Sequence, residues 1–401
     1  MAFGNAGVSG PAWRVIAWMC VAHVATMTGF STFAALLPQL QREWGLSNAD
    51  AGLVSGAFFG GYMIAVPLLT SLTDRIDARR VYFASTLAAA CGLAGFALFA
   101  RGTASAATLH ALVGIGIAGT YMPGLKALAD RIGGPAQARA VSFYTAIFGI
   151  GLSVSALLAG KAEAAFGWRG AFALAAIGPP IAGLMVLFGL EPRRPHAAAP
   201  AGVIEGLGRV VRDARVRPFI LGYAVHCWEL FGSRSWMVAF LVFAQGAASW
   251  AIGPIAIVAM INMLSPVASI LGNETALRIG RARLIRTGMA ISAVLTCLLG
   301  FQAGLPAGAL GALVAIHIML VMIDSSALTA GLVAAADARE RGAAMALHST
   351  LGFGAGFLAP LAFGLVLDAA GGNQSTTAWG LAFVVLGAGG LAAPFALKFR
   401  K

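Results

Sequence analysis

The sequence predicts an all-α polytopic membrane protein in which twelve transmembrane helices form two pseudo-symmetric six-helix bundles. Composition, long charge-free runs and an internal repeat predict this class. Hydrophobic residues make up 59% of the 401 residues and charged residues only 10%, against roughly 25% charged in soluble domains. Runs such as 51–73 and 81–100 contain no charged residue except near their ends, and about 20 apolar residues cross a bilayer. A soluble enzyme, a disordered chain and a small disulfide scaffold are excluded.

Breaks at glycine, proline and charge clusters divide the chain into twelve predicted spans. In the first half these are 14–37, 50–72, 81–100, 104–125, 140–162 and 168–190. In the second half they are 218–245, 250–272, 284–302, 307–334, 343–369 and 377–397. The first apolar run starts at Arg14 and continues beyond the length of a signal-peptide core, so we expect it to be retained as the first span.

The distribution of basic residues predicts the orientation of these spans. With the N-terminus on one side of the membrane, 22 of the 27 Lys and Arg residues fall on that side and four on the other, while Arg234 lies within a span. Cytoplasmic loops carry the excess of positive charge, so we expect both termini in the cytoplasm and a location in the bacterial inner membrane. The net charge of +12 is then a topology signal, and we expect no nucleic-acid partner.

The sequence offers no pattern for a cofactor, a metal or catalysis. The four cysteines lie far apart inside apolar runs without C-x-x-C spacing, which is typical of packed core residues. A G-x-x-x-x-G-K-[ST] phosphate loop is absent, which argues against ATP-driven pumping. The scattered His, Glu and Asp residues show no nucleophile–base spacing, so we expect neither an enzyme, nor a cofactor, nor a metal site.

A polar linker divides the chain into two units of similar length. We expect an N-terminal bundle at 1–190, a linker at 191–217 and a C-terminal bundle at 218–401. Within the linker the segment 203–212 is weakly amphipathic. It is expected either to lie along the cytoplasmic membrane face as a short helix or to be a solvated connection.

Features of the first half recur in the second half at separations of 202 to 211 residues. Three pairs of features match: Arg75 with Arg278 at a separation of 203 residues, Arg139 with Arg341 at 202, and the pattern W-x-x-A-F at 168–172 and 379–383. Two six-helix repeats joined by a basic linker are the plan of alternating-access transporters, whose solute sites lie near the midplane at the repeat interface.

With these features the chain resembles the major facilitator superfamily along nearly its whole length. Asp74-Arg75 followed by Arg79-Arg80 is similar to the family's signature between the second and third spans, although Asp77 stands where a glycine is usual. We expect Asp74 to open the third helix, because a carboxylate is favoured at a helix N-terminus. The resemblance implies that Asp74, Arg75, Arg79 and Arg80 form a cytoplasmic gate that stabilises the outward-facing state. Simple anchoring by positive charge is the alternative for the arginines.

Ionisable side chains inside the spans are the candidate functional residues, since a charge in the hydrocarbon region is costly. They concentrate in the first, fourth, seventh and tenth spans, which line the central cavity in the family that the chain resembles. The candidate substrate-binding residues are Arg234, His226, Glu229, Tyr121, Tyr223 and Ser233. The candidate proton-coupling residues are Glu229, Asp324, His110, His317 and His23.

Arg234 is the only permanent cation placed deep in a span, so we expect it to bind an anionic group such as a carboxylate. Histidine titrates near neutral pH, which favours the histidines together with Glu229 or Asp324 as proton carriers. Glu229 lies about 140° around an ideal helix from Arg234, so a pair within the helix is awkward. Asp324 is a partner for Arg234 across the cavity, and structural neutralisation of Arg234 is the alternative to a binding role.

We therefore expect a monomeric, proton-coupled secondary transporter whose partners are a small anionic organic solute, protons and the bilayer. Import by symport is favoured because the fifth span, around 149–155, lacks the Gly-Pro element of drug antiporters. The alternative is proton-driven efflux of drug-like or metabolic compounds. A transition-metal importer is a third interpretation based on the 13 methionines, but no M-x-x-x-M or H-x-x-x-M pair occurs in the seventh or eighth span.

Overall fold

The computed structural model describes residues 10–133, 135–193, 203–246, 250–337 and 340–397, and all regular structure within them is helical. The first half of the chain forms α1 (Gly10–Thr26), the 3-10 turn η1 (Met27–Gly29), α2 (Thr32–Trp44), α3 (Asn48–Leu72), α4 (Ala78–Phe99), α5 (Thr103–Ala129), α6 (Pro135–Ala175) and α7 (Gly178–Gly189). The linker contains α8 (Val203–Arg212), at the segment whose amphipathic pattern was noted in the sequence.

The second half begins with a long helix, and two of its later spans are each divided into a pair of shorter helices, α10 with α11 and α13 with α14. It comprises α9 (Arg217–Gln245), α10 (Pro254–Asn262), α11 (Ser265–Ile279), α12 (Arg281–Leu299), the 3-10 turn η2 (Gly300–Gln302), α13 (Ala307–Met322), α14 (Ser325–Ala335), α15 (Arg341–Ala369) and α16 (Thr376–Ala396).

The helices account for twelve crossings of a membrane. Ten stretches of the described chain are long and apolar enough to cross, and one of them, 139–189, has 51 residues. At 1.5 Å per residue that stretch would span roughly 75 Å, more than twice the hydrocarbon core. Gly167 leaves the helical conformation (φ 70°, ψ 176°) and divides it into two spans. Helix α9, with 29 residues, is also long enough to cross. It is not among the ten stretches because its polar residues lower its mean hydropathy.

Side-chain caps determine where several helices begin. The hydroxyl of Ser47 accepts the backbone N–H of Asp50 at the start of α3, and Ser375 accepts that of Ala378 at the start of α16. The Asp77 carboxylate accepts the backbone N–H of Arg79 at the start of α4. The expectation that Asp74 opens this helix is therefore wrong, because Asp77 supplies the capping carboxylate three residues later.

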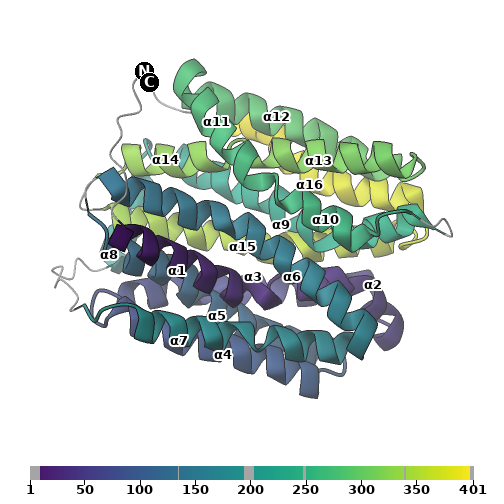
Figure 1. Cartoon of the computed structure of the whole chain (residues 1–401). Helices are drawn as coiled ribbons and strands as arrows, with labels where there is room; N and C mark the ends of the chain where they lie inside the picture. The colour runs from purple at the N-terminus through teal and green to yellow at the C-terminus, as the bar shows by residue number, and fades with distance from the viewer. Residues whose placement is uncertain (1–9, 134, 194–202, 247–249, 338–339, 398–401) are drawn as a thin grey trace.

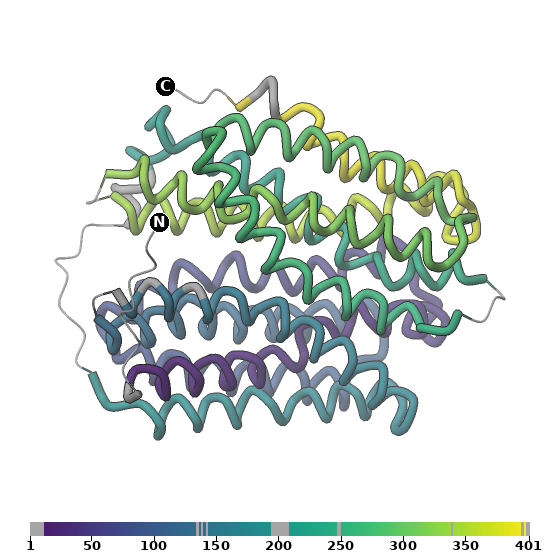
Figure 2. Tube along the Cα trace, turned by 45° about the horizontal axis from the view of Figure 1, so that its top comes forward, coloured from purple at the N-terminus to yellow at the C-terminus, as the bar shows by residue number. Residues whose placement is uncertain are grey.

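The two halves lie side by side with their helices roughly parallel, as Figures 1 and 2 show in purple to teal and in green to yellow. Helix α8 marks one end of the molecule, which we call the linker end, and the turn between α2 and α3 marks the opposite end, the far end (Figure 1). The first turn of α1 and the last turn of α16 both lie at the linker end, as an even number of crossings requires (Figure 2).

Helices α3 and α15 join the halves most closely. No Cβ could be added at Gly52 or Gly56 without meeting the backbone carbonyl of Pro360 or Phe357, so only glycine permits this approach. At the far end the Asp368 carboxylate of α15 accepts the backbone N–H groups of Asn48 (3.1 Å) and Ala49 (2.8 Å) and the side-chain amide of Asn48 (2.7 Å). A carboxylate from one half thus caps the first turn of a helix in the other.

The described ends of the linker attach to different halves. Arg193 donates its backbone N–H to Asp77 in the first half (3.0 Å). In α8, Arg209 forms an ion pair with Glu340 at the start of α15 (2.6 Å), and Val210 is buried against the second half.

The repeated W-x-x-A-F pattern has the same structural role in both halves. Trp168 and Phe172 are buried where the sixth span begins, and Trp379 and Phe383 are buried at the start of α16. The indole N–H of Trp168 donates to Glu43 and that of Trp379 donates to the carbonyl of Asn373. Each tryptophan fixes the beginning of the last span of its half.

Candidate functional site

A cavity of about 50 Å³ lies between the two halves. The first half contributes residues of α2, α3, α5 and α6 and of the turn before α2, and the second half contributes residues of α9 and α10. The first, fourth and seventh spans thus line it, in agreement with the expectation from the family resemblance. The tenth span contributes none of its lining residues, and the second, fifth and eighth spans do so instead.

Arg234 is the only permanently charged residue in the lining of this cavity. One terminal nitrogen, Nη2, donates to the Ser265 hydroxyl (2.9 Å) and lies 4.0 Å from the sulfur of Met322. Within the described residues Arg234 forms no ion pair. The partner suggested from the sequence, Asp324, is paired with His226 instead. Arg234 therefore presents a positive charge to the cavity that no nearby carboxylate neutralises.

Three buried polar atoms on residues that line the cavity have no hydrogen-bond partner in the described part of the chain: Nε of Arg234, Oγ of Ser55 and Nε2 of His110. The other ring nitrogen of His110, Nδ1, lies 2.8 Å from the carbonyl oxygen of Val54. A carbonyl only accepts, so Nδ1 carries the proton, and Nε2 of the neutral ring is a free acceptor. Buried polar atoms are normally satisfied, so a bound molecule or water would complete these three.

The remaining wall of the cavity is largely aromatic. Five phenylalanines line it: Phe30, Phe33, Phe58, Phe59 and Phe231. Phe59 of α3 and Phe231 of α9 contact each other across the interface between the halves, with their ring centroids 4.3 Å apart and their planes tilted by 32°. A solute here meets one fixed cation and an apolar surface supplied by both halves.

His226 and Asp324 lie in buried contact in the second half. Nδ1 of His226 lies 2.8 Å from Oδ1 of Asp324, and both side chains are no more than 4% exposed. Tyr223, another candidate, stacks on the ring of His348 at 3.7 Å and lies 5.7 Å from His226. The pair joins α9 to the break between α13 and α14, and none of these residues lines the cavity.

A second polar cluster surrounds Glu229 inside the C-terminal bundle. The Glu229 carboxylate accepts the hydroxyls of Thr296 (2.6 Å) and Ser292 (3.2 Å), both from α12. The Thr296 hydroxyl lies 3.1 Å from Nδ1 of His317, and Nε2 of His317 lies 3.1 Å from the hydroxyl of Ser233. Glu229 and His317 therefore meet through one threonine, and Ser233 joins them through His317, away from the cavity lining.

Three aromatic rings lie around His23 in the first half. Its ring lies 4.6 Å from Tyr144, 5.5 Å from Tyr121 and 6.1 Å from Phe148, and its side chain is buried. Neither ring nitrogen has a hydrogen-bond partner among the described residues. His23 and Tyr121 are thus brought together, as two candidates from the first and fourth spans.

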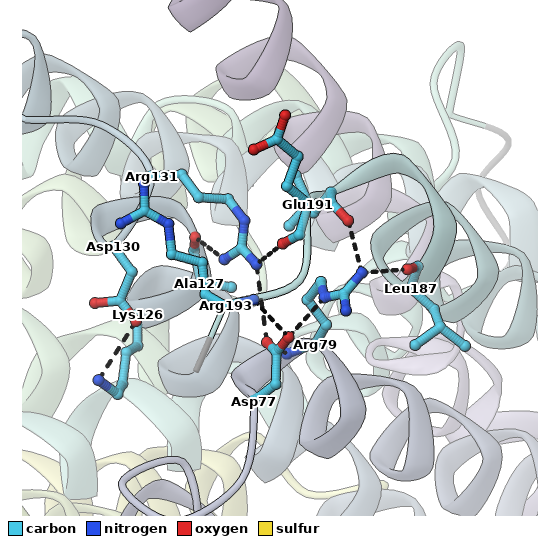
Figure 3. A network of polar contacts seen from close by, with 10 residues as sticks. Asp77, Arg79, Lys126, Ala127, Asp130, Arg131, Leu187, Glu191 and Arg193 are labelled. Carbon is cyan, nitrogen blue, oxygen red and sulfur yellow. Dashed lines mark hydrogen bonds and ion pairs between the residues drawn. The ribbon is translucent and has the colours of Figure 1, made fainter. Parts of the chain in front are cut away.

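Of the four predicted gate residues, only Arg79 belongs to a polar cluster at the linker end (Figure 3). Arg79 pairs with Asp77 (2.9 Å) and donates to the carbonyls of Leu187 and Leu190 at the end of α7. Arg131 lies 3.8 Å from Asp77 and donates to the carbonyls of Ala127 and Glu191. Asp74, Arg75 and Arg80 are exposed, and the gate role of all four residues stays a prediction.

The electrostatics of this cluster depend on Asp77. Burial on its own would raise the pKa of Asp77, but the backbone N–H groups of Arg193 and Arg79 and the Arg79 guanidinium outweigh that effect. The pKa of Asp77 is therefore lowered, and the carboxylate stays charged between two arginines. The cluster ties the turn before α4, the end of α5 and the end of α7 together within the first half.

Several residues of these clusters were not predicted from the sequence. Three of them lie at helix ends: Asp77, Arg131 and Asp368. The sequence does not show which residue a charged side chain at a helix end contacts. Thr296 and Ser292 are hydroxyl residues in an otherwise apolar span, and only their spacing of four, which places both on one helix face, was a usable signal.

The chain belongs to the Major Facilitator Superfamily, whose family model matches residues 19–394. It is therefore a multi-pass membrane protein of a transporter family. A comparison with curated proteins gives no match.

Solved structures of transporters share the fold. A bacterial homolog of the human lysosomal transporter Spinster, in an inward-facing and unoccupied conformation, is 16% identical with a TM-score of 0.76, over 98% of this chain and 95% of that one. A variant of the nucleoside transporter NupG is 15% identical with a TM-score of 0.75, over 96% and 98%. The POT family transporter PepTSo is 14% identical with a TM-score of 0.75, over 96% and 97%. At these identities the likeness establishes the fold alone.

Proposed function

We propose that this protein is a proton-coupled secondary transporter that moves a small anionic organic solute across the bacterial inner membrane by alternating access. Both termini face the cytoplasm, and the solute and protons enter together as in a symporter. The observation that carries the proposal is the unpaired guanidinium of Arg234 in the cavity between the halves.

The chemistry of the cavity supports a monocarboxylate with a small apolar body. One permanent cation matches one negative charge, and the planar guanidinium suits the two oxygens of a carboxylate. Ser55 offers a further donor, and Nε2 of His110 would become one if the ring took up a proton, while the five phenylalanines accommodate an apolar part. A volume of about 50 Å³ holds roughly four water molecules, which favours a compact solute in this state.

Proton coupling is supported by the ionisable groups beside this site. His110 lines the cavity itself, and His226 and Glu229 lie on α9, the helix that carries Arg234, where they contact Asp324 and Thr296. A proton taken up on one of these groups offsets the charge of the anion, so that the loaded carrier crosses its occluded state at lower electrostatic cost.

The test compares acids with their neutral analogues. The thermal stability of the purified protein would be measured with propionate, benzoate and succinate, and with propionamide and benzamide. A ligand at a hundredfold excess over its Kd stabilises the folded state by about 2.7 kcal/mol. We expect stabilisation by a monocarboxylate and not by its amide, its loss in Arg234→Ala, and its retention in the exposed control Arg101→Ala. Equal stabilisation of Arg234→Ala would refute the proposed site.

The aromatic lining favours proton-driven efflux of an amphiphilic compound as the second candidate. The two functions differ in the direction of proton movement. In vesicles that contain a pH-sensitive dye, a symporter takes up protons with the added solute, whereas an antiporter releases them.

A further inference from the structure

We infer that Thr296, His317 and Ser233 form a proton wire that leads to Glu229, and that Glu229 is the residue that stores the transported proton. This inference rests on the proposed proton coupling and identifies which of the candidate groups perform it.

The first argument is the continuity of the contacts. Four side chains from three helices follow one another at hydrogen-bond distance: Glu229 to Thr296 at 2.6 Å, Thr296 to His317 at 3.1 Å, and His317 to Ser233 at 3.1 Å. All four are buried. Each link between the ends can both donate and accept a proton, which is the requirement for passing one along.

The second argument is that the same atom positions fit two complete sets of hydrogen bonds. With Glu229 ionised, Thr296 donates to its carboxylate, Nδ1–H of His317 donates to Thr296, and Ser233 donates to Nε2. With Glu229 protonated, every bond reverses: Glu229 donates to Thr296, Thr296 donates to Nδ1, and Nε2–H donates to Ser233. The hydroxyl of Thr296 also lies 2.8 Å from the carbonyl of Ser292, so it turns between acceptors without moving its oxygen.

The conversion between the two sets balances with one proton. A proton arrives at the Ser233 hydroxyl, whose own proton moves to Nε2 of His317. The ring gives the proton on Nδ1 to Thr296, and the Thr296 proton moves to Oε1 of Glu229. His317 ends neutral as the other tautomer, and the net change is the protonation of Glu229. The Ser292 hydroxyl bonds the other oxygen, Oε2, in both states.

The third argument is the position of the wire beside Arg234. Ser233 directly precedes Arg234 on α9, and the sulfur of Met322 on α13, five residues after His317, lies 4.0 Å from the Arg234 guanidinium. Helices α9 and α13 thus each carry a residue of the wire and a residue of the Arg234 site. An anion bound at Arg234 acts on the helices that hold the proton, so the two binding events are coupled without a shared ligand.

The other ionisable groups that face Glu229 are few. Asp324 is one of them, and it is itself in contact with His226 on α9. Cys297 of α12 is another. Helix α16 approaches Glu229 at Gly390, where an added Cβ would lie 3.4 Å from Oε2 and which brings no titratable group.

The experiment follows the infrared band of a protonated carboxylic acid in the full-length protein in lipid nanodiscs, after a rapid drop in pH from above to below neutral. It needs no solute, so it can fail or succeed independently of the Arg234 binding test. We expect a carboxyl band in the unmodified protein and its loss in Glu229→Gln.

Thr296→Val keeps the shape of the side chain and removes the hydroxyl. We expect the band to appear about tenfold more slowly, as a barrier raised by one lost hydrogen bond predicts. Thr296→Ser should restore the rate. Thr287→Val is the matched control, since Thr287 lies on the same helix and donates only to carbonyls of α12. A band unchanged in Glu229→Gln would refute Glu229 as the store, and equal rates in Thr296→Val and Thr287→Val would refute the wire.

Discussion

His23 and His226 lie 203 residues apart, the separation that also relates Arg75 to Arg278, and each belongs to the first span of its half. Their surroundings differ in kind. His23 is enclosed by aromatic rings and has no hydrogen-bond partner among the described residues. His226 is paired with Asp324, and the residue 203 positions before Asp324 is Tyr121, one of the rings around His23.

Other equivalent positions show the same division. Glu229 corresponds to Thr26, and His317 corresponds to Gly114. The repeat therefore preserves the backbone plan while the ionisable groups gather in the second half. The first half contributes aromatic walls and only His110 to the cavity as a titratable group. Under the proposed function, the C-terminal bundle would supply the charge and the proton carriers, and the N-terminal bundle would supply most of the aromatic wall of the site.

The largest effect is expected when the contact between His226 and Asp324 is removed. In His226→Leu the Asp324 carboxylate is left buried without its partner, which costs roughly 3–5 kcal/mol of unfolding free energy. Thermal or denaturant unfolding of the purified protein measures it. The double variant His226→Leu, Asp324→Leu should recover most of the loss, because no unpaired charge remains. A single-variant cost below about 1 kcal/mol would contradict the pairing.

A smaller effect is expected at the far end, where the halves are joined. Asp368→Ala removes a carboxylate that caps α3. We expect this to weaken the contact between the halves at the far end by about 1–2 kcal/mol. Pulsed electron paramagnetic resonance between spin labels on α3 and α15 would show a larger population of long distances. Asp130→Ala, which removes an exposed carboxylate at the linker end, should leave this distribution unchanged.

The Asp77 cluster should respond to acid. A carboxylate with a lowered pKa stabilises the fold above its unfolded pKa, and this stability is lost as the pH falls through the folded value. The model-peptide pKa of Asp is about 3.9, so the loss begins near that pH and continues below it. Asp77→Asn should cost about 1 kcal/mol at neutral pH and flatten the acid limb of a plot of melting temperature against pH. An unchanged acid limb would contradict the role of Asp77.

The smallest effect is expected at His23, the residue of the first half that corresponds to His226. Replacing a buried polar group that has no partner by an apolar one is close to neutral or stabilising. We expect His23→Leu to change the unfolding free energy by less than about 1 kcal/mol, measured in the same way as His226→Leu. Destabilisation as large as that of His226→Leu would show that His23 has a polar partner after all.

Most of the fold could be predicted from the sequence, because membrane insertion imposes a simple rule on composition. Charge-free runs locate the spans, and the predicted break between 162 and 168 coincides with the non-helical Gly167. The twelve-span family fold is confirmed. The separate helices α10 and α11, and α13 and α14, were not foreseen, because a short break within an apolar run leaves no mark on hydropathy.

The candidate site was predicted only in part. The sequence identified the rare buried charges, because each carries a large desolvation cost and must face protein or water. It could not determine which of them meet. Helix rotation and packing decide that Asp324 pairs with His226 and that Glu229 turns toward α12, away from Arg234. Thr296, the residue that connects Glu229 to His317, is uncharged and gave no signal of its own.

The most direct test of the central claim is uptake of a radiolabelled monocarboxylate into proteoliposomes with an imposed inward proton gradient. The unmodified protein should accumulate the acid, and a protonophore should abolish the accumulation. Arg234→Ala should reduce uptake to that of empty vesicles, while the exposed control Arg101→Ala stays at the level of the unmodified protein. Accumulation by Arg234→Ala equal to that of the unmodified protein would contradict the assignment of Arg234 as the anion-binding residue.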